Sequence, residues 1–393
     1  MTPVPPYDFR RAFPWLAFVT GLFFLNFLTR VIFSPLMLDI ERDLGIHHAQ
    51  AGRLYLVFSV GYAVSLFASG FISTRIRHRT VISVSAVAVG ISFIAIAMTR
   101  TYLELSLGLL AFGLAGGLYL PSGIAALTSL VREKDYGKAF SVHELAPNLS
   151  LFLAPVLAVL LLDHMSWRDM LAYIGLISIV TGALFQWKGR GGDETGRSPD
   201  IELIGSFVRA RQFWGLLLLF FIAVGASFAP YSVMPLYLVD ERGLSENWAQ
   251  QLLAISRITG PIGAVLSGWL SDRLGPGRTI SLYLVFCGGS TMALGLAQGG
   301  FLTAAVILQA LSSVMFFPAG FSLLSKVFPS DVRSMAISCI IPAAFILGNG
   351  LAPSLLGWAG HHGAFDIGFI CQGGFMLLGL IVIPLLRERL DTV

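Results

Sequence analysis

Apolar runs long enough to cross a bilayer recur twelve times along this chain of 393 residues. Inside hydrocarbon every backbone N–H and C=O must find a partner within the protein, so runs of this length must be helices. The composition agrees, because 55% of the residues are hydrophobic and only 12% are charged. We therefore predict an all-α multi-pass membrane protein with spans at roughly 13–37, 52–72, 80–99, 102–127, 139–162, 169–187, 213–238, 249–271, 279–298, 301–325, 335–359 and 364–386.

Basic residues predict the orientation of these spans. Nineteen of the 26 lysines and arginines fall in loops and tails on the side that holds both termini. Because such residues are enriched on the cytoplasmic side, we expect both termini in the cytoplasm, in a bacterial inner membrane. The net charge of +4 is explained by these loops, so it does not indicate a nucleic-acid partner.

The polar segment in the middle of the chain divides it into two halves. Residues 188–202 read KGRGGDETGRSPDIE, and their glycines and charges predict a flexible linker that buries nothing. We place a bundle of six helices at 1–187, a cytoplasmic linker at 188–212 and a second bundle of six helices at 213–393. A weak internal repeat at an offset near 200 residues supports pseudo-symmetry between the bundles, as in Pro35-Leu36 and Pro235-Leu236, Glu41-Arg42 and Glu241-Arg242, or Arg79-Thr80 and Arg278-Thr279.

No pattern of residues indicates catalysis. Cys287, Cys339 and Cys371 lie in apolar runs without metal-ligand spacing, so we expect no metal site. No glycine-rich loop has the sequence of a phosphate-binding loop, so we expect no nucleotide cofactor. The chain is predicted to be a monomeric membrane protein that is not an enzyme.

Two loops carry related motifs. The stretch from Gly268 to Arg278, GWLSDRLGPGR, resembles the signature of the major facilitator superfamily in the loop after the eighth helix. The copy from Gly70 to Arg79 keeps the glycine and Arg75 but has Thr74 in place of the usual aspartate. Ser166-Trp167-Arg168 fits the same superfamily. The resemblance implies two bundles that alternate access to a central site, with a cytoplasmic gate formed by Gly70, Arg75, Gly268, Asp272, Arg273 and Arg278.

Arg30 lies well inside the first apolar run, where a charge is tolerated only if it faces a watery cavity or a partner. The stretch Asn26-Phe-Leu-Thr29-Arg30 resembles the Asn-Tyr-x-Asp-Arg of organic anion:proton symporters, whose arginine binds the acid group of the substrate. Thr29 and Gly116 stand where members of that branch carry carboxylates. Arg257 in the eighth run is similar to a position in monocarboxylate transporters.

The rise per residue places Arg30 roughly 7 Å and Arg257 roughly 4 Å to the outer side of the middle of their spans. We therefore expect two arginines, one from each half, to bind one carboxylate. At this level we also place the substrate-binding candidates Asn26, Tyr119, Tyr231 and Asn349, of which the last three have an alternative interpretation as helix-packing residues.

Glu144 is the one acidic residue well inside a span, and it follows His143. A carboxyl in an apolar region and a histidine are the groups able to exchange protons near neutral pH, so both are candidates for proton coupling. The alternatives are that His143 bonds to a neighbouring helix and that Glu144 pairs with Lys138 as part of the gate.

These features predict a secondary transporter of a small organic anion, a carboxylate in the first instance, driven by a co-transported proton. The alternatives are an anion exchanger, an exporter of the same superfamily and a membrane sensor that keeps the transporter fold.

Overall fold

The computed structural model describes residues 7–132, 135–196, 208–328 and 330–386. In these ranges twelve helical spans are long and apolar enough to cross a membrane, which confirms the number and the order predicted from the sequence. The spans are Phe9–Leu44, His48–Ile72, His78–Ala97, Tyr102–Leu130, Lys138–Leu161, Trp167–Lys188, Arg211–Glu241, Glu246–Leu274, Pro276–Leu296, Gly300–Val327, Cys339–His361 and Phe365–Leu386.

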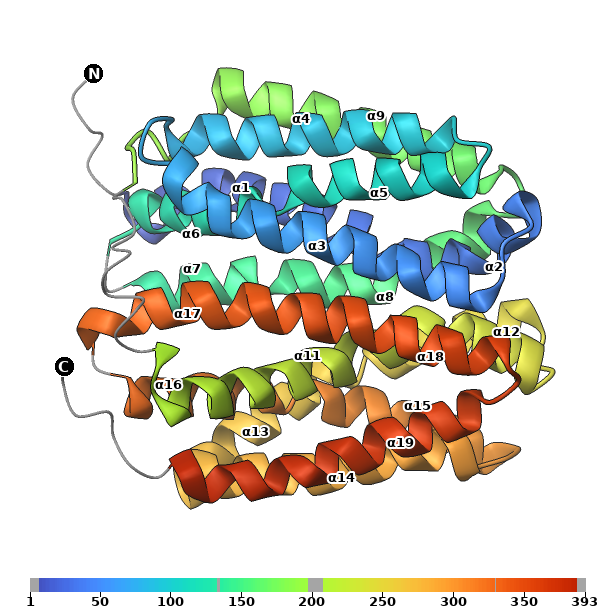
Figure 1. Ribbon diagram of the computed structural model, residues 1–393. Helices are drawn as coiled ribbons and strands as arrows, with labels where there is room; N and C mark the ends of the chain where they lie inside the picture. Colours follow the sequence, from blue (N-terminus) through green and yellow to red (C-terminus); the bar gives the residue numbers. More distant parts are fainter. Residues whose placement is uncertain (1–6, 133–134, 197–207, 329, 387–393) are drawn as a thin grey trace. The chain divides into compact units, whose positions relative to one another are not determined.

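Five of these spans are pairs of helices with a short break between them (Figure 1). The pairs are α1 (Phe9–Val31) with α2 (Phe33–Leu44), α5 (Tyr102–Gly116) with α6 (Tyr119–Leu130), α7 (Tyr136–His143) with α8 (Leu145–Leu161), α12 (Glu246–Arg257) with α13 (Gly260–Leu274), and α15 (Gly300–Ser313) with α16 (Phe316–Val327).

The other spans run without such a break. They are α3 (His48–Ile72), α4 (His78–Ala97), α9 (Trp167–Lys188), α11 (Arg211–Leu236) with the π-helical η2 (Tyr237–Glu241), α14 (Pro276–Leu296), α17 (Ser330–Phe345) with the π-helical η3 (Ile346–Leu351) and α18 (Ala352–His361), and α19 (Phe365–Leu378) with the 3₁₀-helical η4 (Gly379–Leu386).

Prolines account for the breaks. A proline has no N–H to bond the carbonyl four residues earlier, and its ring clashes with that carbonyl. One proline stands at the second or third position of α2, α6, α8, α13, α16 and α18. The carbonyls that lose their helical partner belong to Val31, Gly117, His143, Arg257, Val314 and Asn349. Two of these residues, His143 and Arg257, are site candidates next to a break, and a third, Asn349, lies in the π-helical η3, where the span continues.

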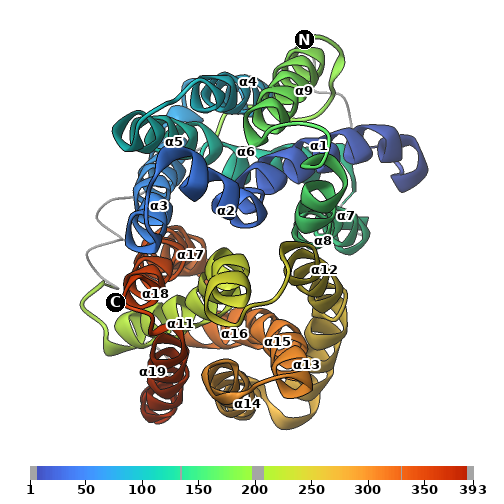
Figure 2. The same ribbon diagram turned by 90° about the vertical axis from the view of Figure 1, so that its right-hand side faces the viewer.

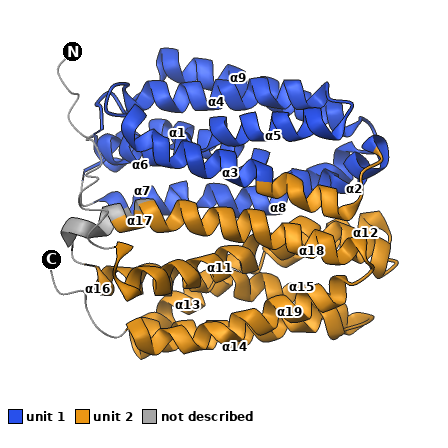
Figure 3. Cartoon of the chain, in the orientation of Figure 1, with its two compact units in different colours: residues 1–44, 57–199 blue, residues 45–56, 200–393 orange. Residues whose placement is uncertain are grey.

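The chain forms two compact units (Figure 3). Unit 1 contains residues 1–44 and 57–199, and unit 2 contains residues 45–56 and 200–393. The first turns of α3 therefore pack with unit 2, although they precede the central linker in the sequence.

Glycines at related positions of the two units let helices pack closely. A Cβ atom added to Gly90 in α4 would lie 2.4 Å from the carbonyl oxygen of Gly175 in α9. A Cβ atom added to Gly373 in α19 would lie 2.5 Å from the carbonyl oxygen of Gly288 in α14. Each pair is glycine against glycine, which is typical of membrane helices whose backbones touch. Figure 2 shows α4 beside α9 and α14 beside α19 when the helices are viewed along their axes.

The start of the central linker is bound to unit 1. The first N–H groups of α4 donate to it, from His78 to the carbonyl of Glu194 at 3.2 Å and from Arg79 to that of Gly192 at 2.8 Å. Arg79 also pairs with Asp193 at 3.0 Å. The expectation that this segment buries nothing is therefore wrong for residues 189–196, because the free donors at the start of a helix need acceptors.

Candidate functional site

In unit 1, Arg30 lies two residues before the break between α1 and α2. The carbon of its guanidinium group is 4.1 Å from the ring centroid of Phe27 and 4.9 Å from that of Tyr62 in α3. Cation–π contacts of this kind stabilise a positive charge in an apolar region without neutralising it. The guanidinium of Arg30 is therefore positively charged and in contact with two aromatic rings.

Asn26 is one helical turn before Arg30 and is 6% exposed. Its Nδ2 donates to the carbonyl of Gly116 at 3.1 Å, which joins α1 to the end of α5, and Thr29 Oγ1 donates to the carbonyl of Asn26 at 2.8 Å. Asn26 Oδ1 is buried and accepts no hydrogen bond from the described residues. Thr29 and Gly116, which stand where related symporters carry carboxylates, thus both contact Asn26. Asn26 Oδ1 can accept a hydrogen bond from a donor group of a bound molecule.

His143 is held in a stack of three rings. Its ring is stacked 4.2 Å from that of Phe23 of α1, and the ring of Tyr119 of α6 is parallel to both, 5.3 Å from Phe23 and 6.3 Å from His143. The hydroxyl of Tyr119 donates to the carbonyl of Val19 at 2.9 Å and lies 3.3 Å from His143 Nε2. Because the single proton of the hydroxyl is used by Val19, His143 Nε2 must be the donor in the second contact. Tyr119 and His143, both 1% exposed, hold α1, α6 and α7 together in this structure.

Glu144 occupies the break between α7 and α8. Its backbone is satisfied, since its N–H donates to Phe140 at 2.8 Å and Asn148 Nδ2 donates to its carbonyl at 2.9 Å. Lys138, the alternative partner for its carboxylate, bonds instead to Asp135 at 2.9 Å. Within the part of the chain that the structure describes, no ion pair includes Glu144, so its carboxyl is available to exchange a proton.

In unit 2, Arg257 is the last residue of α12 and only 6% exposed. Its guanidinium carbon is 4.6 Å from the ring centroid of Tyr231 in α11. Arg257 Nε is buried and donates to no described residue, and no ion pair among the described residues includes this arginine. A buried guanidinium held only by an aromatic face is costly unless a partner binds it, so Arg257 is the stronger of the two anion-binding candidates.

Asn349 lies in the π-helical turn η3 and is 6% exposed. Gln372 of α19, which the sequence analysis does not single out, donates from Nε2 to the carbonyl of Gly225 in α11 at 3.1 Å. Its Oε1 is buried and accepts no hydrogen bond from the described residues. A glutamine within an apolar span is the sequence signal that could have identified it.

The predicted gate residues lie near the ends of α3, α13 and α14 or, for Arg75, in the turn after α3. Arg75, Asp272 and Arg273 are all exposed, and the guanidinium carbon of Arg273 is 4.3 Å from the ring centroid of Trp269. Arg278 lines a cavity of about 670 Å³ together with Lys326. Where the structure describes side chains, no ion pair includes Asp272, so the charged gate stays a prediction.

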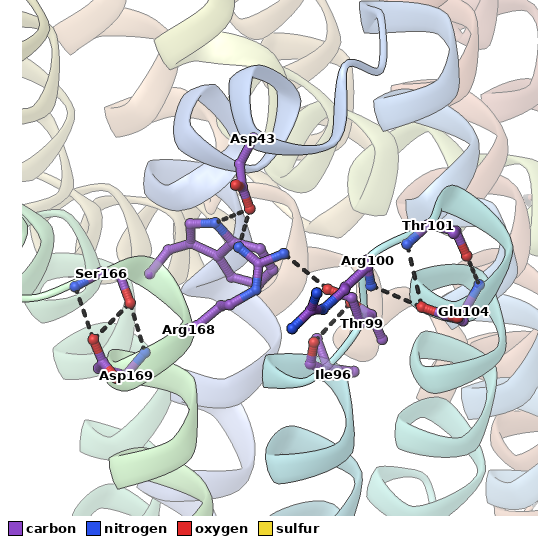
Figure 4. A network of polar contacts seen from close by, with 10 residues as sticks. Asp43, Ile96, Thr99, Arg100, Thr101, Glu104, Ser166, Arg168 and Asp169 are labelled. Carbon is purple, nitrogen blue, oxygen red and sulfur yellow. Dashed lines mark hydrogen bonds and ion pairs between the residues drawn. The ribbon is translucent and has the colours of Figure 1, made fainter.

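The stretch from Ser166 to Arg168 forms a polar corner at the other end of unit 1 (Figure 4). Arg168 bonds to Asp43 and donates to the carbonyl of Thr99 at 2.8 Å, while Trp167 Nε1 donates to Asp43 at 3.2 Å. Ser166 caps α9. These contacts join the ends of α2, α4 and α9, so this motif stabilises the bundle.

Comparisons with known proteins agree with this architecture. A sequence profile of the Major Facilitator Superfamily matches residues 19–305 and again 262–392. A "Probable hexose phosphate transport protein" of Chlamydia trachomatis is 24% identical over 315 residues, covering 71% of this chain and 68% of that protein. "Monocarboxylate transporter 13" of Bos taurus is 26% identical over 379 residues, covering 89% and 87%.

Solved structures show the same fold. The crystal structure of a bacterial homologue of the human lysosomal transporter Spinster, in its inward-facing and unoccupied conformation, has a TM-score of 0.84 at 14% identity. The alignment covers 97% of this chain and 99% of that one. The predicted fold class, two related sets of six membrane helices, is confirmed.

Proposed function

This chain belongs to the Major Facilitator Superfamily, and from that premise we propose that it carries a small organic anion, with a carboxylate as the first choice of substrate. It is a transporter rather than an enzyme, and a multi-pass protein of the inner membrane. The proposed mechanism is alternating access, in which the bound anion is exposed first to one side of the membrane and then to the other.

The observation that carries this proposal is the buried state of Arg257. A guanidinium cannot lose its charge at physiological pH, and burying it costs free energy that a bound anion offsets. Arg30 supplies a second positive charge from the first span. The ring face of Tyr231 contacts the guanidinium group of Arg257, whose Nε donates to no described residue and can therefore bind a carboxylate oxygen. The names of the two relatives, a hexose phosphate and a monocarboxylate transporter, support an anion.

Glu144 is the proposed proton carrier. It stands at a helix break, and its carboxyl group takes part in no ion pair among the described side chains. His143 is placed differently, because its ring is buried between helices and its Nε2 proton is directed at Tyr119. We therefore assign proton coupling to Glu144 first and give His143 a positioning role beside it. Exchange of one anion for another is the second mechanism.

A ligand screen tests the substrate class. Purified protein is heated alone and with lactate, benzoate, glucuronate, a hexose phosphate, inorganic phosphate or uncharged glucose. A ligand that binds the native protein alone raises the unfolding temperature in proportion to the logarithm of its concentration. We expect at least one carboxylate to stabilise the protein and glucose to have no effect. Stabilisation by the phosphates alone would replace carboxylate with phosphate ester, and stabilisation by glucose alone would contradict an anion carrier.

A further inference from the structure

Four of the seven histidines of the chain lie together at one end of unit 2. His47 precedes His48, the first residue of α3, and His362 follows His361, the last residue of α18 (Figure 1 labels both helices). We refer to the four as the histidine cluster. The rings of His47 and His361 are stacked, with centroids 4.0 Å apart and an angle of 23° between their planes. The ring of His362 lies 5.2 Å from that of His361. The two chain segments are some 300 residues apart, so only the fold brings these rings together.

The helices behind the cluster are in close backbone contact. A Cβ atom added to Gly52 in α3 would lie 2.9 Å from the carbonyl oxygen of Pro353, and one added to Gly357 in α18 would lie 2.5 Å from that of His48. Ser354 Oγ donates to the carbonyl of Gly52 at 2.9 Å. Because the two backbones are in contact here, a small repulsion at the histidines acts directly on the helix contact.

The charges around His47 all favour its neutral form. His361, Arg53 and His48 are the titratable groups that act on it, and each can only add positive charge. Desolvation of the stacked ring is the largest cause that lowers the pKa of His47 from its ordinary value of 6.5, and these three groups add to it. His48 is different, because its Nε2 lies 3.5 Å from the carboxylate of Asp240. Glu241, next to Asp240, is engaged by the backbone N–H groups of Phe365 and Asp366.

We propose that the stacked His47 and His361 form a pH-sensitive latch, which holds α3 against α18 while both rings are neutral and releases them when both are protonated. The separated form binds more protons than the closed form, so closure is favoured above pH 6.5 and is lost as the pH falls below that value. By the predicted orientation the latch faces the outside, where acidity would favour opening. This proposal depends on the contact between α3 and α18 and is independent of the anion that is carried.

The size of the effect follows from the distance and the exposure of the rings. Two unit charges about 4 Å apart in a water-like medium repel enough to change an equilibrium about fivefold. Both rings are exposed, so protons reach them and salt screens them. Protonation of His48 acts in the opposite direction, because it strengthens the contact with Asp240.

The test measures the separation of the two helices as a function of pH. Spin labels are attached to cysteines introduced for Val60 in α3 and Leu355 in α18, both exposed, in a chain whose three native cysteines are replaced by alanine. Distance distributions are recorded by double electron–electron resonance in lipid nanodiscs at pH 7.5 and 5.5. We expect the ratio of separated to closed molecules to rise about fivefold at pH 5.5, with a smaller rise at high salt.

Variants separate the latch from a general effect of acid. His47→Gln with His361→Gln should remove most of the pH dependence, whereas His164→Gln, an exposed histidine in the turn after α8, should leave it unchanged. His48→Gln should make the acid opening larger. An unchanged distance distribution in the parent protein, or a full pH response in the double variant, would overturn the proposal.

Discussion

Replacement of Arg257 by glutamine is expected to have two effects of opposite sign. The protein without ligand should become more stable, because a buried positive charge without an acidic partner among the described residues is removed. Binding of the anion should be lost, because the same charge is its partner. Replacement of a residue that only packs the helices would give the opposite result for both effects. The protein would be less stable, and anion binding would be intact.

The magnitudes follow from the contacts of Arg257. A hydrogen bond to a charged group contributes about 1.5–3 kcal/mol, so the loss of both bonds of a two-pronged contact should weaken binding by about 3–6 kcal/mol, or roughly 160- to 25,000-fold. Removal of the desolvated charge should stabilise the empty protein by on the order of 1 kcal/mol, a rise of about 2 °C in Tm. Arg257→Lys keeps the charge without the fork and should bind with intermediate affinity.

Thermal unfolding with and without the carboxylate from the ligand screen measures both effects in one assay. Arg211→Gln is the matched control, because Arg211 is an exposed arginine at the start of α11 in the same unit. It should change neither the Tm of the empty protein nor the shift with ligand. If Arg257→Gln unfolds at a lower temperature and still responds fully to the carboxylate, then Arg257 is a structural residue and the reasoning from its burial is refuted.

Three further predictions concern coupling, the gate and helix packing. Glu144→Gln should abolish accumulation driven by a pH gradient but keep exchange of labelled for unlabelled substrate; accumulation that persists would exclude Glu144 as proton carrier. Asp272→Asn should shift the balance between inward-open and outward-open states, and equal labelling of introduced cysteines on both faces before and after the change would disprove the gate. Gly90→Ala should cost about 1–3 kcal/mol because its Cβ would meet the Gly175 backbone, whereas Gly289→Ala, which has open space, should not lower the Tm.

Long apolar runs and a weak internal repeat made the fold predictable. A span of twenty apolar residues admits almost no structure but a helix, so the twelve spans and their order follow from the sequence. The repeat at an offset near 200 residues also reappears in packing, since Gly90 and Gly175 of unit 1 have counterparts at Gly288 and Gly373. The twelve helices could be predicted because the hydrocarbon of the bilayer offers no hydrogen-bond partner to the backbone.

The breaks within spans were not predicted, although their signal was present. Pro147 and Pro261 follow His143 and Arg257 by four residues, the spacing at which a proline removes a helical hydrogen bond. Mean hydropathy is an average over about twenty residues, so it does not reveal the loss of a single backbone hydrogen bond at a proline. Arg257 is buried as expected for a substrate residue, whereas Tyr119 and His143 bond to each other and to α1, which is the packing alternative.

Contacts between distant segments could not be read from the sequence at all. The stacking of His47 on His361 depends on where α3 and α18 meet, and the sequence around each histidine does not predict this contact. The same holds for the linker residues that bind the start of α4, where glycines and charges suggested a free segment. Local chemistry predicts elements, and only the packed structure shows which elements meet.

Uptake into proteoliposomes tests whether the chain transports a carboxylate and whether Arg30 and Arg257 are required. The purified protein is reconstituted, and accumulation of a radiolabelled carboxylate from the ligand screen is followed with the vesicle interior alkaline, for the parent chain, Arg30→Gln, Arg257→Gln and the control Arg211→Gln. We predict accumulation above the external concentration by the parent and the control, and a loss of at least tenfold in the initial rate for Arg30→Gln and for Arg257→Gln. Equal uptake by all four proteins, or no uptake of any carboxylate by the parent, would contradict the account.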